Sequence, residues 1–213
     1  MARNVLYLHG FASSPRSAKI LLLRPLLAPF GVDLDTPDLN VPSFEELDFP
    51  SMVDKAIGHA QRRRPVAIAG SSLGALVALA VARQGFPVPL VLLAPALGIG
   101  ERWKTRLPDG DPVVVWNHAR NAEAPIHRRF FDQMNDLAVD RDPPPARTTV
   151  VMGRHDETVP FELVEETWQR WEAAGLAEGS RFIALDEGDH GLTAYGDVIA
   201  RAIAVAAGAL GSD

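Results

Sequence analysis

The sequence of 213 residues contains no cysteine. Disulfide bonds, thiolate metal sites, iron–sulfur clusters and a cysteine nucleophile are therefore excluded. Positive charge is also scarce, since 21 Lys and Arg residues stand against 27 Asp and Glu residues and leave a formal net charge of −6. A chain without an excess of basic residues is poorly suited to neutralise a nucleic-acid backbone or an anionic membrane. We expect neither partner, and the lack of cysteine is compatible with a cytoplasmic location.

Long hydrophobic runs are also few. The N-terminal apolar run extends only from Val5 to Leu8, which is shorter than the roughly 7–15 apolar residues of a signal peptide. Residues 66–82 carry no charge, but the segment GSSLG interrupts them. We interpret this stretch as a buried strand followed by a buried helix rather than as a membrane span. We therefore expect one globular domain over residues 1–213.

Short apolar runs alternate with longer helical patterns along the chain. The predicted strands are residues 4–8, 32–36, 65–69, 90–94, 148–152 and 181–185. The predicted helices are residues 15–27, 44–63, 73–84, 161–174 and 192–207, with Ser14 as N-cap of the first and Pro15 at its first position. This alternation predicts an α/β fold with a mainly parallel sheet of about six or seven strands and helices on both faces.

The most informative segment is Gly70-Ser71-Ser72-Leu73-Gly74, which lies between a predicted buried strand and a predicted helix. A GxSxG sequence in this setting is typical of a nucleophile elbow, in which small flanking residues let the chains approach closely. The N-terminus of the following helix then directs N–H groups at the site. We predict that Ser72 is a nucleophile. The alternative is a tight turn whose serines, including Ser71, only cap the helix.

Two residues that could activate this serine follow the last two predicted strands. Asp156 lies in the loop after residues 148–152, and His190 lies in the loop after residues 181–185. Catalytic groups of such sheets gather beyond the carboxyl ends of the strands. A serine needs a base to remove its proton and a third group to orient that base. We therefore predict a catalytic triad of Ser72, Asp156 and His190.

Neighbouring residues offer alternatives for these roles. Glu157 is a possible substitute for the acid. We expect His155 to be a solvated loop residue, and Asp186 and Asp189 lie too near His190 in the sequence to orient it easily. None of the six histidines shows a metal-binding spacing, so we expect neither a metal nor a cofactor.

The turn His9-Gly10-Phe11 at the end of the first predicted strand supplies a further element. Such a turn offers a backbone N–H beside the serine elbow. We assign the oxyanion hole to the backbone N–H groups of Phe11 and Leu73. We expect the side chain of His9 to pack or to form hydrogen bonds that hold this loop.

The segments LYLHGF, GSSLG, GRHDETVP and GDHGL, in this order, resemble the α/β-hydrolase superfamily over nearly the whole chain. The opening LYLHGFASSPRSAK is similar to that of small bacterial YqiA-like esterases. The resemblance implies hydrolysis of acyl esters without a cofactor. One departure is that the sequence begins at the strand with the His-Gly turn, so we expect the two antiparallel strands that usually precede it to be missing.

These observations predict a serine hydrolase that cleaves a small carboxylic ester or thioester through an acyl-enzyme on Ser72. The alternatives are a peptidase or C–C bond hydrolase that uses the same triad, and a binding protein without catalytic activity. The oligomeric state is not predicted.

A long insert over residues 95–147 separates two predicted strands and is expected to act as a lid or pocket wall. We expect a hairpin near residues 112–116 and a helix over residues 126–137. The insert carries large apolar side chains that could line an acyl pocket, namely Trp103, Trp116, Phe130, Phe131 and Met134. The alternative is that some of these side chains pack on the sheet instead.

Overall fold

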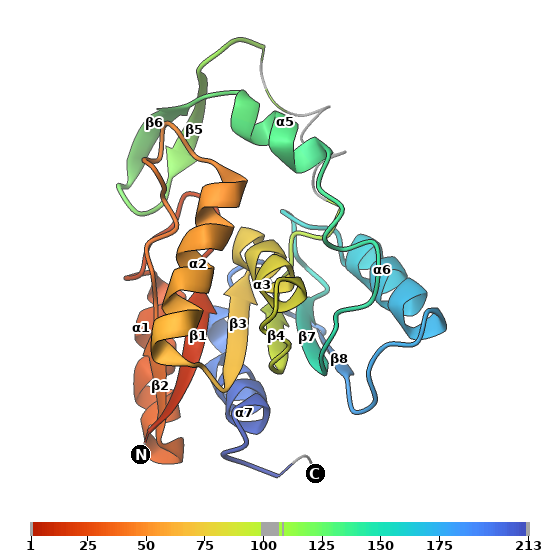
Figure 1. The fold of residues 1–213 in the computed structure, drawn as a ribbon. Coiled ribbons are helices and arrows are strands. Elements are labelled where there is room, and N and C mark those ends of the chain that lie inside the picture. Colours follow the sequence, from red (N-terminus) through yellow and green to blue (C-terminus); the bar gives the residue numbers. More distant parts are fainter. Residues whose placement is uncertain (1, 99–106, 108, 212–213) are drawn as a thin grey trace.

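The computed structural model describes residues 2–98, 107 and 109–211. Its central sheet has six strands in the order β2-β1-β3-β4-β7-β8, and every neighbouring pair is parallel (Figure 1). The strands are β1 (Arg3–Leu8), β2 (Val32–Asp35), β3 (Ala67–Ser71), β4 (Leu90–Leu93), β7 (Thr148–Gly153) and β8 (Arg181–Leu185). The predicted fold class is therefore confirmed.

Helices cover both faces of this sheet. They are α1 (Ala18–Leu27), α2 (Phe49–Arg63), α3 (Leu73–Arg83), α6 (Phe161–Ala173) and α7 (Gly196–Ala206), with short 3-10 helices η1 (Ala28–Phe30) and η2 (Thr193–Tyr195). Helices α2 and α3 pack together on one face, α1 and α7 pack together on the other, and α6 contacts β7 (Figure 1). The central strands β3 and β4 are buried along their whole length, as strands covered on both faces should be.

Four predicted helix starts are wrong. The helices predicted from residues 126 and 192 begin at Arg129 and Gly196, and the helix predicted from Pro15 begins at Ala18. The helix predicted over residues 44–63 begins at Phe49, because a start at residue 44 would place Pro50 in the helix interior, where it removes a hydrogen bond. Asp48 caps this helix instead and accepts the N–H of Ser51 at 2.9 Å. The N-cap of α1 is Ser17 rather than Ser14, since residues 14–17 form a separate turn.

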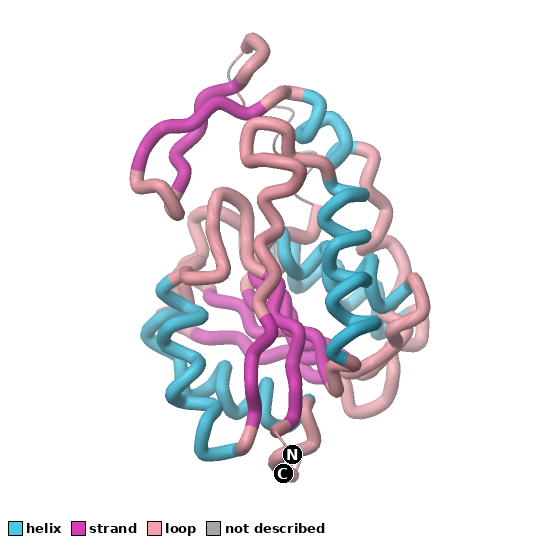
Figure 2. The backbone as a smooth tube through the Cα atoms, turned by 60° about the vertical axis from the view of Figure 1, so that its left-hand side comes forward, coloured by secondary structure: helices cyan, strands magenta, loops and turns pink. Residues whose placement is uncertain are grey.

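The insert contains an antiparallel hairpin of β5 (Val113–Asn117) and β6 (Ala122–Ile126), followed by α5 (Arg129–Asn135). These elements lie beyond the carboxyl ends of the sheet strands (Figures 1 and 2). The ring of Phe130 stacks on Phe11 with centroids 5.8 Å apart and planes 8° from parallel. This contact attaches α5 to the turn that follows β1.

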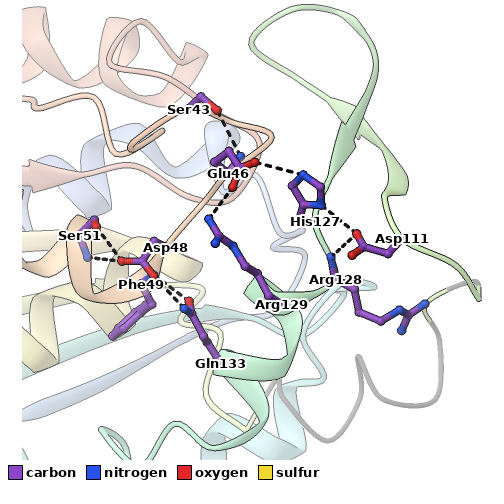
Figure 3. Close-up of polar contacts among 10 residues, drawn as sticks. All are labelled: Ser43, Glu46, Asp48, Phe49, Ser51, Asp111, His127, Arg128, Arg129 and Gln133. Carbon is purple, nitrogen blue, oxygen red and sulfur yellow. Dashed lines mark hydrogen bonds and ion pairs between the residues drawn. The ribbon is translucent and has the colours of Figure 1, made fainter.

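Polar contacts join the insert to residues 43–51 (Figure 3). The ring of His127 lies between two carboxylates, with Nε2 3.1 Å from Glu46 and Nδ1 3.1 Å from Asp111. Gln133 donates to Asp48 at 2.8 Å and accepts the backbone N–H of Phe49 at 3.0 Å. Hydrogen bonding to Ser51 keeps the pKa of Asp48 below its usual range. The insert is thus attached to the N-terminal end of α2.

None of the helices that the structure describes is long and apolar enough to cross a membrane. The uncharged residues 66–82 contain β3, the turn at Ser72 and most of α3, so the predicted strand followed by a helix is confirmed.

Candidate active site

Ser72 occupies the turn between β3 and α3 with φ of 54° and ψ of −118°. This is a strained conformation for a residue with a side chain, of the kind that concentrates at functional sites. The flanking glycines explain how the turn is possible. A Cβ on Gly70 would overlap the carbonyl of Gly74, and a Cβ on Gly74 would overlap the carbonyl of Leu8. The GxSxG spacing is therefore required by close backbone packing.

Ser72 is half-buried and lines a pocket of about 740 Å³, called here the elbow pocket. Phe11, Leu73 and His190 also line it. Leu73 is the first residue of α3, so its N–H has no acceptor within the helix. The structure thus gathers four of the five predicted site residues around one pocket.

The fifth residue, Asp156, lies behind His190. Its Oδ2 is 2.8 Å from Nδ1 of His190, and its Oδ1 accepts the backbone N–H groups of Thr158 at 2.9 Å and Val159 at 2.8 Å. The side chain of Asp156 has no exposed surface, whereas that of His190 is 28% exposed. Since a carboxylate can only accept, Nδ1 donates in this pair. In the neutral ring Nε2 is then the basic nitrogen.

The alternative residues have other environments. Glu157 lines the elbow pocket but is exposed, and His155 is exposed with Nδ1 3.5 Å from Glu187. Asp186 pairs with Arg154, and Asp189 accepts the backbone N–H of Leu192 at 2.8 Å. The hydrogen bond between Asp156 and His190 distinguishes Asp156 from these other carboxylates.

The turn after β1 lies directly against the elbow. A Cβ on Gly10 would come within 3.2 Å of both the Ser71 carbonyl and the Ser72 Cβ, so a glycine allows this approach. His9 is 3% exposed, and its Nε2 accepts the backbone N–H of Leu39 at 2.9 Å. Its Nδ1 lies 2.9 Å from the Gly10 carbonyl. His9 therefore holds the loop by hydrogen bonds, as predicted.

The sequence interpretation missed Lys19, on the first turn of α1. Its Nζ donates to Oγ of Ser71 at 2.9 Å, and both residues line the elbow pocket. Burial lowers the pKa of Lys19 to about 8, although Asp156 and Asp189 oppose this shift. The signal in the sequence is a lysine just after an N-cap serine, on the helix that follows the His-Gly turn. The pairing with Ser71, 52 residues away, is a tertiary contact.

The expectation that aromatic residues of the insert line the pocket is wrong for the residues that the structure describes. The insert contributes Ala96, Leu107 and His118 to the lining, because the larger side chains are used elsewhere. Phe130, Phe131 and Met134 are buried in the core cluster, and Trp116 is 49% exposed on the hairpin. Trp103 lies outside the described residues.

No group of three His, Asp or Glu side chains with the arrangement of a metal site occurs in residues 2–98, 107 and 109–211.

Comparison with known proteins supports the fold and the family. The model of an uncharacterised protein family (UPF0227) matches residues 4–207. Among solved structures, Est1E from Butyrivibrio proteoclasticus with bound ferulic acid is 16% identical, with a TM-score of 0.77 over 94% of this chain and 87% of that one. A search of curated proteins found no match.

Two further structures show the same similarity. A putative hydrolase from Agrobacterium vitis S4 is 17% identical, with a TM-score of 0.77 over 96% of this chain and 88% of that one. Mouse alpha/beta hydrolase domain-containing protein 10 is 16% identical, with a TM-score of 0.73 over 94% and 87% of the two chains. At these identities the likeness establishes the fold. The predicted resemblance to α/β-hydrolases of the YqiA-like group is confirmed.

Proposed function

Because the chain belongs to the UPF0227 family and has the α/β-hydrolase fold, we propose that it is a serine hydrolase that cleaves small carboxylic esters or thioesters. The observation that carries the proposal is the 2.8 Å hydrogen bond between His190 and the buried Asp156. His190 lines the same pocket as Ser72, which occupies a strained turn. A surface histidine and a helix-capping serine would not need this arrangement.

In the proposed reaction Oγ of Ser72 attacks the carbonyl carbon of the ester, and Nε2 of His190 takes the serine proton. The same nitrogen returns that proton to the leaving alcohol as the C–O bond breaks. An acyl-enzyme on Ser72 remains, and a water molecule activated by His190 hydrolyses it to the free acid. Asp156 keeps the proton of the neutral ring on Nδ1 and stabilises the imidazolium that forms in each half of the cycle.

The negative charge that develops on the carbonyl oxygen needs donors beside Ser72. We assign this role to the backbone N–H groups of Leu73, at the start of α3, and of Phe11, in the turn packed on the elbow. Such donors contribute most where charge appears only in the transition state.

The size and lining of the elbow pocket favour small substrates. A volume of about 740 Å³ is within the usual range for small-molecule sites. The structurally similar Est1E binds ferulic acid, a small carboxylic acid, which is the kind of product that ester hydrolysis releases.

The test is hydrolysis of p-nitrophenyl butyrate by the wild-type protein and by Ser72→Ala. We expect kcat to fall by on the order of 10³-fold or more in the variant, with its thermal unfolding little changed. An active Ser72→Ala variant together with an inactive Ser71→Ala variant would move the nucleophile to the neighbouring residue.

A further inference from the structure

The part of the elbow pocket that Lys19 lines has a surplus of hydrogen-bond donors. The ammonium of Lys19 is placed there although the residue is only 9% exposed, and it donates to Oγ of Ser71 at 2.9 Å. Ser17 and Ala18, at the N-terminus of α1, line the same pocket. A helix N-terminus carries partial positive charge and unpaired N–H groups. This part of the pocket therefore combines a full positive charge with further donors.

Lys19 has no acidic partner at contact distance among the residues that the structure describes. The two carboxylates that act on it at longer range are engaged elsewhere, since Asp156 binds His190 and Asp189 accepts the N–H of Leu192. An ammonium has three N–H donors, of which Ser71 takes one. A buried charge without a partner is costly. The arrangement is therefore incomplete until an anion from outside the chain supplies the acceptors.

Tyr7 adds to this surplus. Its buried hydroxyl lies close enough to Ser71 to affect the pKa of Tyr7, but it makes no hydrogen bond of good geometry within the described residues. Tyr7 also lines the pocket. Burial raises the pKa of Tyr7, so the hydroxyl keeps its proton and remains a donor. Glu157 is the carboxylate found in the described part of the pocket lining, and it is exposed.

We propose that Lys19 and Ser71 bind a carboxylate carried by the substrate, so that the preferred substrates are half-esters of short dicarboxylic acids. This inference rests on the proposed esterase function. Ser71 immediately precedes the nucleophile, and consecutive Cα atoms are about 3.8 Å apart. A group bound to Ser71 and Lys19 therefore lies only a few bonds from the carbonyl that Ser72 attacks. A carboxylate has two acceptor oxygens, which match one N–H of Lys19 and the O–H of Ser71.

A different role for Lys19 would be to support the elbow alone. In that case its loss would affect all esters alike, because the geometry of Ser72 is common to every substrate. An anion-binding role affects only substrates with the negative charge. The two roles are therefore separated by a ratio of activities on a charged ester and a neutral ester of the same shape.

The experiment compares monoethyl succinate with ethyl levulinate, in which an acetyl group replaces the carboxylate. Ethanol release is measured for the wild-type protein and for Lys19→Met. We expect the wild-type protein to favour monoethyl succinate in kcat/KM, and the ratio of the two values to fall by about tenfold to a hundredfold in the variant, as expected for a lost charged hydrogen bond. Lys55→Met, which removes a positive charge on α2, is the matched control and should retain the preference.

Equal kcat/KM for the two esters in the wild-type protein, or an unchanged ratio in Lys19→Met, would overturn the anion site while leaving the esterase proposal intact. Failure of the wild-type protein to hydrolyse either ester would count against the esterase proposal instead. Calorimetric titration of monoethyl succinate into Ser72→Ala then tests the anion site without catalysis. Binding that is at least tenfold weaker in Ser72→Ala/Lys19→Met supports it, and equal binding overturns it.

Discussion

Nδ1 of His190 lies 2.8 Å from Oδ2 of Asp156, and the other oxygen of this carboxylate accepts two backbone N–H groups. The carboxylate is thus fixed by three hydrogen bonds at a position without solvent exposure. An acid held in this way can orient the imidazole and compensate its positive charge.

Replacing Asp156 with Asn should lower kcat by on the order of 10³–10⁴-fold, because an amide does not hold the ring in the required tautomer. Glu157→Gln alters an exposed carboxylate next in the sequence and should reduce kcat far less. Steady-state kinetics with p-nitrophenyl butyrate measure both variants. Equal losses, or a loss confined to Glu157→Gln, would transfer the acid to Glu157.

Replacing Phe130 with Ala should destabilise the fold by about 3–4 kcal/mol, since a fully buried ring that stacks on Phe11 leaves a cavity. Trp116→Ala, on the same insert but 49% exposed, should change the free energy of unfolding by less than about 1 kcal/mol. Urea unfolding measures both values. A Phe130→Ala variant as stable as the wild-type protein would show that α5 is not attached through this ring.

Stability should rise between pH 8 and pH 10 because of Lys19. Burial lowers its pKa from 10.5 to about 8, so in this window the unfolded chain binds more protons than the folded chain. Stability rises with pH wherever this holds, and the gain over the window is about 2 kcal/mol. The raised pKa of Tyr7 acts in the opposite direction, but only above about pH 10.

Urea unfolding of the wild-type protein and of Lys19→Met across this window is the measurement. The variant should show a flatter dependence on pH. The same slope in both proteins would mean that Lys19 does not titrate in this range.

Activity on p-nitrophenyl esters should increase over the first few acyl carbons and then decline. Each added CH₂ contributes about 0.8 kcal/mol only while it finds apolar cover, and the elbow pocket of about 740 Å³ is limited in size. The described insert residues that line it are Ala96, Leu107 and His118. A series from acetate to palmitate checks this, and a maximum of kcat/KM at palmitate would contradict it.

Much of the site could be predicted because its residues follow local rules. The small residues around Ser72, between a buried strand and a helix, predict that it is the nucleophile. Asp156 and His190 are predicted as its activating residues because each lies in a loop that follows a strand. Local rules alone could not decide which serine caps α1. Both Ser14 and Ser17 carry the N-cap signal, and only the packed structure selects Ser17.

Tertiary contacts account for what could not be predicted. In the sequence Lys19 is an ordinary residue of a helical first turn. Only the folded chain brings this turn to the end of β3, where Lys19 donates to Ser71. The aromatic residues of the insert are apolar, so the sequence is compatible both with lining a pocket and with packing in the core. Phe130 and Phe131 pack with Phe11, and this choice depends on where α5 meets the turn after β1.

The most direct test of the account is the mass-spectrometric location of a fluorophosphonate label after reaction with the native protein. Such a probe modifies only an activated serine, and the elbow geometry with the His190–Asp156 pair predicts a single adduct on Ser72. Labelling should disappear in Ser72→Ala and fall strongly in Asp156→Asn. An adduct on Ser71, or no adduct on a folded protein, would contradict the assignment of Ser72 as the nucleophile.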